Sequence, residues 1–153
     1  MILPERIAEF IHGPVYMCAG SRDEKLKPCV VHVVGALVSP DRASLTFFVP
    51  EWASGRFVEN LRSNGKLSFN SAHGGEGCYQ IKGNSTEIRP CEPRDYAIQD
   101  IYIKKFSALL VQMGLSQDFA PGWVTKPSLA VKMNFEKIFD QTPGPRSGTE
   151  IKE

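Results

Sequence analysis

The segment SLTFFVPEWASGRFVENLRSNG, residues 44–65, constrains the fold of this chain more than any other. Its apolar run predicts a strand over residues 45–49, and the Pro-Glu-Trp that follows predicts a turn. A short helix comes next, because Ser54 is a favoured N-cap residue and Asn64 and Gly65 are favoured at helix C-termini. The apolar residues of this helix share one face: Phe57, Val58 and Leu61.

The start of the predicted helix has the features of an anion site. Unpaired backbone N–H groups around Gly55, the hydroxyl of Ser54 and the guanidinium of Arg56 are expected together at the positive end of the helix. A phosphate is the commonest biological anion for such a place. The other interpretation is an ordinary capped surface helix with a solvated arginine, and this segment alone leaves both open.

Two strands are expected before this segment. Residues 3–12 predict a short amphipathic helix, and residues 15–21 and 28–38 predict strands joined by a loop of hairpin length, so they should pair antiparallel. The second strand is apolar on both faces, which is typical of a closed or well-covered sheet. His32 interrupts it, and such a histidine has either a structural role or a chemical one.

Two further strands are expected after the helix, over residues 66–71 and 78–88. The glycine-rich loop between them, residues 72–77, lacks the strand-to-helix setting of a nucleotide-binding loop, so we interpret it as a mobile hairpin tip. In the fifth strand Gln80 and Lys82 face away from their apolar neighbours. They form either a solvent-facing ladder or the lining of a polar cleft.

The last part of the chain predicts a long helix, a connector and a final strand, over residues 94–113, 116–127 and 128–135. An apolar stripe at helical spacing runs along the long helix: Ile98, Ile101, Tyr102, Phe106, Leu109, Leu110 and Met113. The stripe should pack on the strands or against a second subunit. We expect one domain over residues 1–153, with residues 143–153 as a flexible tail rich in Pro, Gly and polar residues.

Composition excludes several classes of function. The net charge of +1 gives no indication of nucleic acid as a partner, and no apolar run is long enough to cross a bilayer. The four cysteines lack CxxC spacing, so we interpret them as free thiols and expect neither disulfides nor a metal site. They are Cys18, Cys29, Cys78 and Cys91. Free thiols and the absence of a signal-peptide pattern predict a cytoplasmic protein.

Six strands, a short helix after the third and a long helix before the last predict a mainly β fold, a six-stranded antiparallel split β-barrel. In that order, VPEWASGRFVENLRSNGKLSF and YQIKGNSTEI resemble the pyridoxamine 5′-phosphate oxidase-like family of FMN-binding split barrels. The resemblance covers roughly residues 5–90 and extends to the last strand and the FDQTPGP tail. Its most telling parts are the Ser-x-Arg helix start and the Gln-x-x-Gly of the fifth strand.

The resemblance implies an FMN site shared by two subunits of a homodimer. Ser54 and Arg56 would hold the phosphate, and Gln80 would hydrogen-bond the flavin or the ribityl chain. Trp123 or tail residues of the partner chain would close the site. The candidate cofactor-binding residues are Val31, His32, Val49, Pro50, Ser54, Gly55, Arg56, Gln80, Lys82 and Trp123.

Two departures from the family pattern matter. Pyridoxamine phosphate oxidases carry an arginine on the second strand that reaches the FMN phosphate, and this chain has Val31 at about that position. They also carry C-terminal Trp-Arg and Arg-x-His elements that bind the substrate, and this chain has neither. Oxidation of pyridoxamine phosphate is therefore not expected.

The resemblance leaves three functions open. The first is an FMN-dependent oxidoreductase of unknown substrate, reduced by NADH, NADPH or another small molecule; no acid–base pair identifies catalytic residues. The second is a non-catalytic flavin carrier or redox sensor. The third is a heme-binding split barrel, in which His12, His32 or His73 would be the axial ligand.

Overall fold

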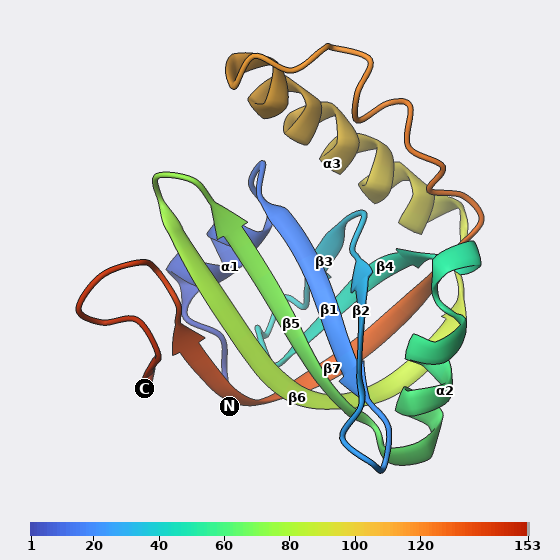
Figure 1. Ribbon diagram of the computed structural model, residues 1–153, viewed down its shortest axis with the longest axis vertical. Coiled ribbons are helices and arrows are strands. Elements are labelled where there is room, and N and C mark those ends of the chain that lie inside the picture. The colour runs from blue at the N-terminus through green and yellow to red at the C-terminus, as the bar shows by residue number, and fades with distance from the viewer. Residues whose placement is uncertain (153) are drawn as a thin grey trace.

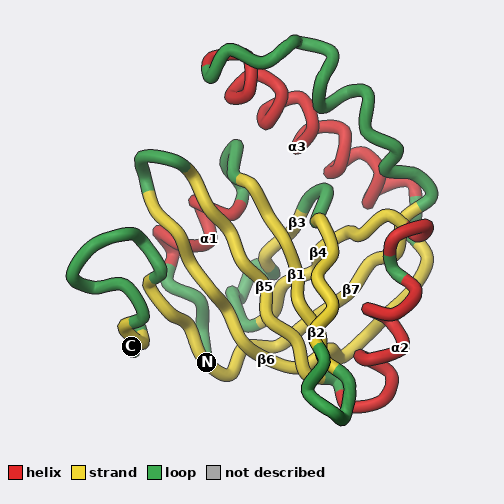
Figure 2. Tube along the Cα trace, in the orientation of Figure 1, coloured by secondary structure: helices red, strands yellow, loops and turns green. Residues whose placement is uncertain are grey.

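The computed structural model describes residues 1–152 and is mainly antiparallel β, as the sequence predicts (Figure 1). The strands are β1 (Tyr16–Arg22), β2 (Pro28–His32), β3 (Ala36–Val38), β4 (Ser44–Pro50), β5 (Lys66–His73), β6 (Gly77–Pro90), β7 (Ser128–Asp140) and β8 (Thr149–Glu150). The helices are α1 (Glu5–Ile11), the 3-10 turn η1 (Glu51–Ala53), α2 (Gly55–Asn64) and α3 (Pro93–Gln112). Figure 2 shows the strands wrapped into a barrel with the helices at its periphery.

The strands form one antiparallel sheet in the order β2-β1-β5-β6-β7-β4-β3, with β8 paired to β7. Strands β2 and β3 are therefore the two ends of the order, although they are consecutive in the chain. Between them Val34 donates its N–H to Phe48 O (2.9 Å), and Phe48 donates to Gly35 O (3.0 Å). This segment joins the two ends of the sheet and closes the barrel.

The single strand expected over residues 28–38 is thus two strands, and the predicted count of six is corrected to seven along the sheet plus the two-residue β8. Gly35 is the reason for the break. Its φ of +131° is one that other residues rarely adopt, and a Cβ there would lie 3.3 Å from Phe48 Cδ2 and 3.4 Å from Gln99 Cα.

The core lies inside the barrel, where alternate side chains of the strands meet the apolar face of α2. The ring of Phe47 on β4 lies 5.5 Å from that of Phe69 on β5 and 6.4 Å from that of Phe57 on α2. Phe57, Val58 and Leu61 are buried, so the predicted apolar face of this helix is confirmed.

The other face of β2, β1, β5 and β6 points outward, towards the viewer in Figure 1, and no helix covers its middle. We call it the outer face. Cross-strand pairing places His32, Cys18, Asn70 and Gln80 in one row across it. Gln80 and Lys82 therefore lie on the outer face, while Ile81 between them points into the core, as the alternation predicts.

Helix α3 stands over one end of the barrel (Figure 1). Tyr102, Phe106 and Leu110 are buried against the same chain, and the Tyr102 hydroxyl donates to Val15 O (2.9 Å). Of the two interpretations of the apolar stripe, packing on the chain's own strands accounts for these three residues. Ile101 and Met113 stay exposed, at 57% and 66%.

Two polar residues of α3 are buried that the sequence did not single out. Asp95 accepts hydrogen bonds from Nη1 and Nη2 of Arg89 (2.6 and 3.2 Å) and forms a capping box with Glu92. Gln99 accepts from the hydroxyl of Ser128 (2.9 Å). These contacts fix the first turns of α3 to β6 and β7. None of the helices in residues 1–152 is long and apolar enough to cross a membrane.

The end of the chain contains a short strand that the sequence did not predict. Thr149 and Glu150 pair with β7, and Ile151 donates its N–H to Ile138 O (2.8 Å). The segment expected as a flexible tail, residues 143–153, therefore contains the short strand β8; residue 153 lies outside the described residues.

Candidate functional site

The start of α2 differs in one respect from the expected capped helix. Ser54 occupies the N-cap position, and its carbonyl accepts the N–H of Val58 (2.8 Å). Its hydroxyl, however, donates to Glu51 O (2.9 Å) in the preceding turn and makes no capping bond. The hydroxyl is buried and already partnered, so it is not presented to a ligand in this arrangement.

Gly55 and Arg56 remain open to solvent at this helix start. No atom lies within 4 Å of the place where a Gly55 side chain would begin. Within residues 1–152, Arg56 makes no ion pair and no side-chain hydrogen bond. The first N–H groups of a helix have no partner inside the helix, and its dipole is positive at this end. Backbone donors and one uncommitted guanidinium therefore lie together here.

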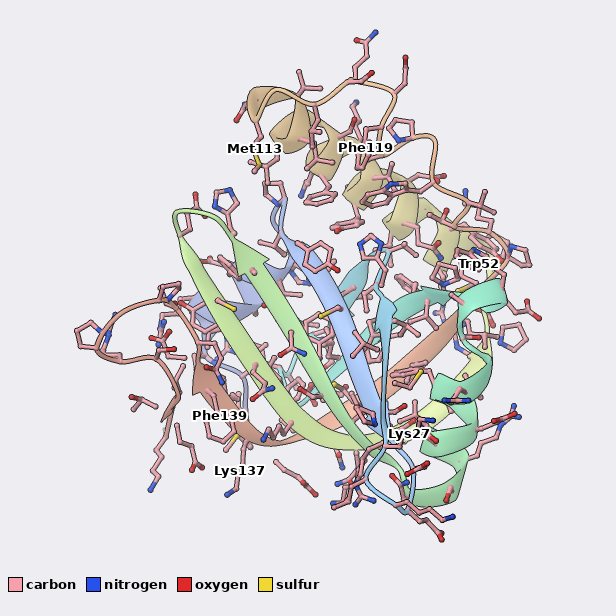
Figure 3. The ribbon with its side chains drawn as sticks, in the orientation of Figure 1. Lys27, Trp52, Met113, Phe119, Lys137 and Phe139 are labelled. Carbon is pink, nitrogen blue, oxygen red and sulfur yellow. The ribbon has the colours of Figure 1, made fainter. Side chains whose placement is uncertain are left out.

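A pocket of about 310 Å³ adjoins the helix start and ends at Ala53, one residue before Ser54. Its lining brings together several predicted site residues and the connector between α3 and β7: Val30, Val31, His32, Val34, Pro50, Trp52, Ala53, Trp123, Val124 and Thr125. Trp52 donates its Nε1–H to Val124 O (2.8 Å), which holds the connector against η1. Figure 3 shows Trp52 beside this connector.

Trp123 reaches the pocket from the same chain, whereas the resemblance implied a residue of the partner. Its ring lies 4.6 Å from that of His32 at 78°, and 5.7 Å from that of Phe106. The ring of Tyr16 stacks on that of His32, with the ring centres 5.2 Å apart. We call Tyr16, His32, Trp123 and Phe106 the aromatic wall. The sequence signal for Tyr16 was its place at the start of the first strand, which by itself points to no ligand.

His32 is the polar member of this wall. Its Nε2 is buried and has no hydrogen-bond partner among the described residues. Burial lowers the pKa of His32, because the charged imidazolium is poorly solvated there. The ring is therefore neutral near pH 7, and its Nε2 is enclosed by the chain without a hydrogen bond.

Other predicted residues do not meet at the pocket. The side chain of Val49 is fully buried in the core, so only its backbone can serve a ligand. Gln80 accepts from Gln141 Nε2 (3.4 Å), and Lys82 places Nζ 5.2 Å from the centre of the Phe139 ring. Gln80 is three strand spacings from β2, or about 14 Å. Within one chain, therefore, Gln80 does not line the pocket beside the start of α2.

The other two histidines and the four cysteines differ in whether their side chains already have hydrogen-bond partners. His12 Nε2 accepts the N–H of Val38 (3.1 Å), so this nitrogen is already used. His73 Nδ1 is buried without a partner. All four cysteines are free, as predicted, and burial raises the pKa of Cys91 to about 11. Among residues 1–152 no cluster of three or more His, Cys, Asp or Glu could hold a metal ion.

No family model matches the sequence, and no curated protein matches it. Solved structures match its fold over most of the chain. HupZ from Group A Streptococcus gives a TM-score of 0.56 at 16% identity, covering 96% of this chain and 100% of that one. A putative pyridoxamine 5′-phosphate oxidase from Lactobacillus delbrueckii gives 0.55 at 16% identity, covering 90% and 93%. An FMN-binding protein from Syntrophomonas wolfei gives 0.53 at 11% identity, covering 89% and 84%. At these identities the likeness shows a common fold.

Proposed function

Because the chain has the split-barrel fold of pyridoxamine 5′-phosphate oxidase-like, FMN-binding proteins, we propose that it binds FMN, with the cofactor's phosphate at the start of α2. The observation that carries this proposal is the uncommitted Arg56 beside the open helix start at Gly55. A dianionic phosphate gains most from such a place, where a guanidinium and backbone donors converge.

The adjoining pocket fits a flavin in its chemistry. The aromatic rings of Trp52, Trp123 and His32 offer flat apolar surfaces to a planar ring. Val31 has no charge, so Arg56 is the one cationic side chain that we propose for binding the phosphate. When bound, FMN supplies the redox chemistry, and the chain supplies binding, orientation and shielding from water.

We further propose a homodimer packed through the outer face. Gln80 and Lys82 lie on the outer face and do not line the pocket at α2. A second copy packed on the outer face would bring them to a cofactor bound at the partner's α2. Val30 on this face is 66% exposed, and its neighbours Gly20 and Ser68 are small enough for close approach. A two-fold contact of this kind is self-complementary.

We propose that the protein is an FMN-dependent oxidoreductase of the cytoplasm, reduced by NADH or NADPH. A flavin carrier or redox sensor is the non-catalytic alternative, since no acid–base pair stands out in the pocket. A heme protein is a second candidate, because His32 Nε2 and His73 Nδ1 are both unpartnered. His12 is a poor axial ligand, since its Nε2 already accepts from Val38.

The absorption spectrum of the purified protein, with added FMN and with added heme, tests these candidates directly. We expect flavin bands that remain with the protein through gel filtration. A Soret band in place of flavin bands would favour heme and overturn the proposal. Stopped-flow reduction of the bound flavin by NADH or NADPH then separates an enzyme from a carrier.

A further inference from the structure

We propose that residues 118–125 form a lid on the pocket at α2, and that one hydrogen bond, from Trp52 Nε1 to Val124 O, is the latch that holds this lid closed. The lid would regulate how fast a ligand enters and leaves. For the identity of that ligand, FMN, the proposal rests on the proposed function, whereas the lid and its latch are features of the free chain.

The lid supplies one wall of the pocket. Trp123, Val124 and Thr125 line it on this side, and the ends of β2 and β4 together with η1 line it on the other. The volume between the two walls is about 310 Å³, at the lower end of the range for small-molecule sites. A ligand with the fused rings of a flavin therefore gains both room and an entrance when the lid moves away from η1.

Both ends of the lid are fixed to the rest of the chain. Before the lid, the hydroxyl of Ser107 on α3 donates to Gln117 O (3.2 Å). After it, Pro127 O accepts the N–H of Glu51 (2.9 Å). Residues 118–125 contain no helix or strand, and Figure 2 shows the connector as a loop that returns along α3 to β7. A loop with fixed ends can move as a flap while the barrel keeps its structure.

The middle of the lid is held by a single polar contact. Within residues 1–152, the latch is the one hydrogen bond between the lid and the barrel or η1. The lid's other hydrogen bonds are turns inside the connector, such as Gly122 N–H to Asp118 O (3.0 Å). Trp123 adds a contact between its ring and that of His32, 4.6 Å apart at their centres. Opening therefore breaks the latch and separates these two rings.

The latch is open to solvent, so water can replace either of its partners. Trp52 is 73% exposed and Val124 is 68% exposed. The net contribution of one such hydrogen bond corresponds to about a two- to tenfold shift of an equilibrium. A latch of this strength favours the closed lid and still lets it open without unfolding the barrel.

Trp52→Phe tests the latch, because phenylalanine keeps an aromatic ring and removes the donor. If FMN passes through the open lid, the population of the open form limits both rates. We expect kon and koff each to rise about two- to tenfold, with Kd within about twofold. Stopped-flow mixing of the full chain with FMN measures kon, and dilution of the complex measures koff. A rise in koff alone would make Trp52 a simple binding contact and overturn the proposal.

Val124→Ala is the matched control, because the latch uses the backbone carbonyl of Val124, which alanine keeps. The variant removes apolar surface from the same wall of the pocket. A change in such a contact acts mainly on koff, so kon should stay within about twofold of the wild type. A rise in kon equal to that of Trp52→Phe would overturn the proposal.

A measurement without flavin separates this proposal from the proposed function. The chain has two tryptophans, so labelling with 5-fluorotryptophan gives two fluorine resonances, and Trp52→Phe keeps that of Trp123. We expect this resonance to shift more between H2O and D2O in Trp52→Phe than in the wild type or Val124→Ala, because the open lid exposes the ring. An unchanged resonance would overturn the latch even where FMN binds. The expected change without FMN binding would support the lid and overturn the flavin assignment alone.

Discussion

Among single residues, Arg56 has the clearest consequence. Its guanidinium has no partner in residues 1–152, and an exposed first-turn arginine contributes little to folding. Arg56→Ala should therefore weaken FMN by about tenfold to a hundredfold, the value of a hydrogen bond to a charged group. Riboflavin, which has no phosphate, should bind nearly as before. Fluorescence titration of both flavins measures the difference.

Arg62→Ala is the matched control, because Arg62 is an exposed arginine in the last turn of the same helix. It should leave the affinity for both flavins unchanged. Equal losses of FMN and riboflavin in Arg56→Ala would show that the start of α2 is not the phosphate site.

His12 makes stability depend on pH. Its neutral Nε2 accepts the N–H of Val38, and burial, followed by the charge of Lys105, lowers the pKa of His12 below 6.5. As the pH falls, the unfolded chain therefore takes up a proton before the folded one. The stabilisation is fully present above pH 6.5 and is lost as the pH falls through the lowered, folded-state pKa.

His12→Gln removes this titration and keeps an acceptor. We expect the free energy of unfolding of the wild type to fall by about 1 kcal/mol more than that of the variant on acidification through this window. Urea unfolding of both proteins at a series of pH values measures it. Parallel curves would show that His12 is not the responsible group.

At the scale of elements, the segment that joins β2 to β3 depends on a glycine at residue 35. Gly35→Ala would force a side chain to a φ of +131° and close to Phe48 and Gln99. We expect a loss of about 1–3 kcal/mol in the free energy of unfolding. Gly74→Ala, where an added Cβ meets nothing within 4 Å, should change it by less than about 0.5 kcal/mol. Similar melting temperatures for the two variants would show that the segment between β2 and β3 does not require a glycine at residue 35.

The same elements show what the sequence could predict. Strand β4, helix α2 and the alternation around Gln80 follow from local periodicity, and the structure confirms all three. The break at Gly35 was missed because a glycine inside an apolar run also fits a continuous strand. Asp95 and Gln99 were missed because polar residues on a helix usually face water, and their partners are remote in sequence. The position of Trp123 in its own chain's pocket depends on the path of a connector that has no regular pattern.

At the scale of the whole molecule, the proposed dimer and the proposed cofactor site depend on each other. Ser68→Asp places a charge in the middle of the outer face, between Gly20 and Lys82, where a partner would exclude water. Light scattering at micromolar concentration should show a dimer for the wild type and a 17.0 kDa particle for the variant. The variant should also bind FMN more weakly, since Gln80 would no longer meet it. Ile101→Asp, on exposed α3, should remain dimeric. A monomeric wild type would contradict both proposals about assembly.

The position of β7 between β6 and β4 has a consequence for synthesis of the protein. Strand β4 pairs with β7 from Ser44 opposite Asn134 to Pro50 opposite Ser128, so its partner is translated long after it. Chains are made at about 5–20 residues per second, so several seconds separate the two strands. Until then β1, β2, β5 and β6 can assemble from the growing chain, while β3 and β4 are joined to them through Val34 and Gly35 and through α2. Both groups lack a pairing partner along one edge until residues 128–140 have been translated and β7 can join β6 to β4.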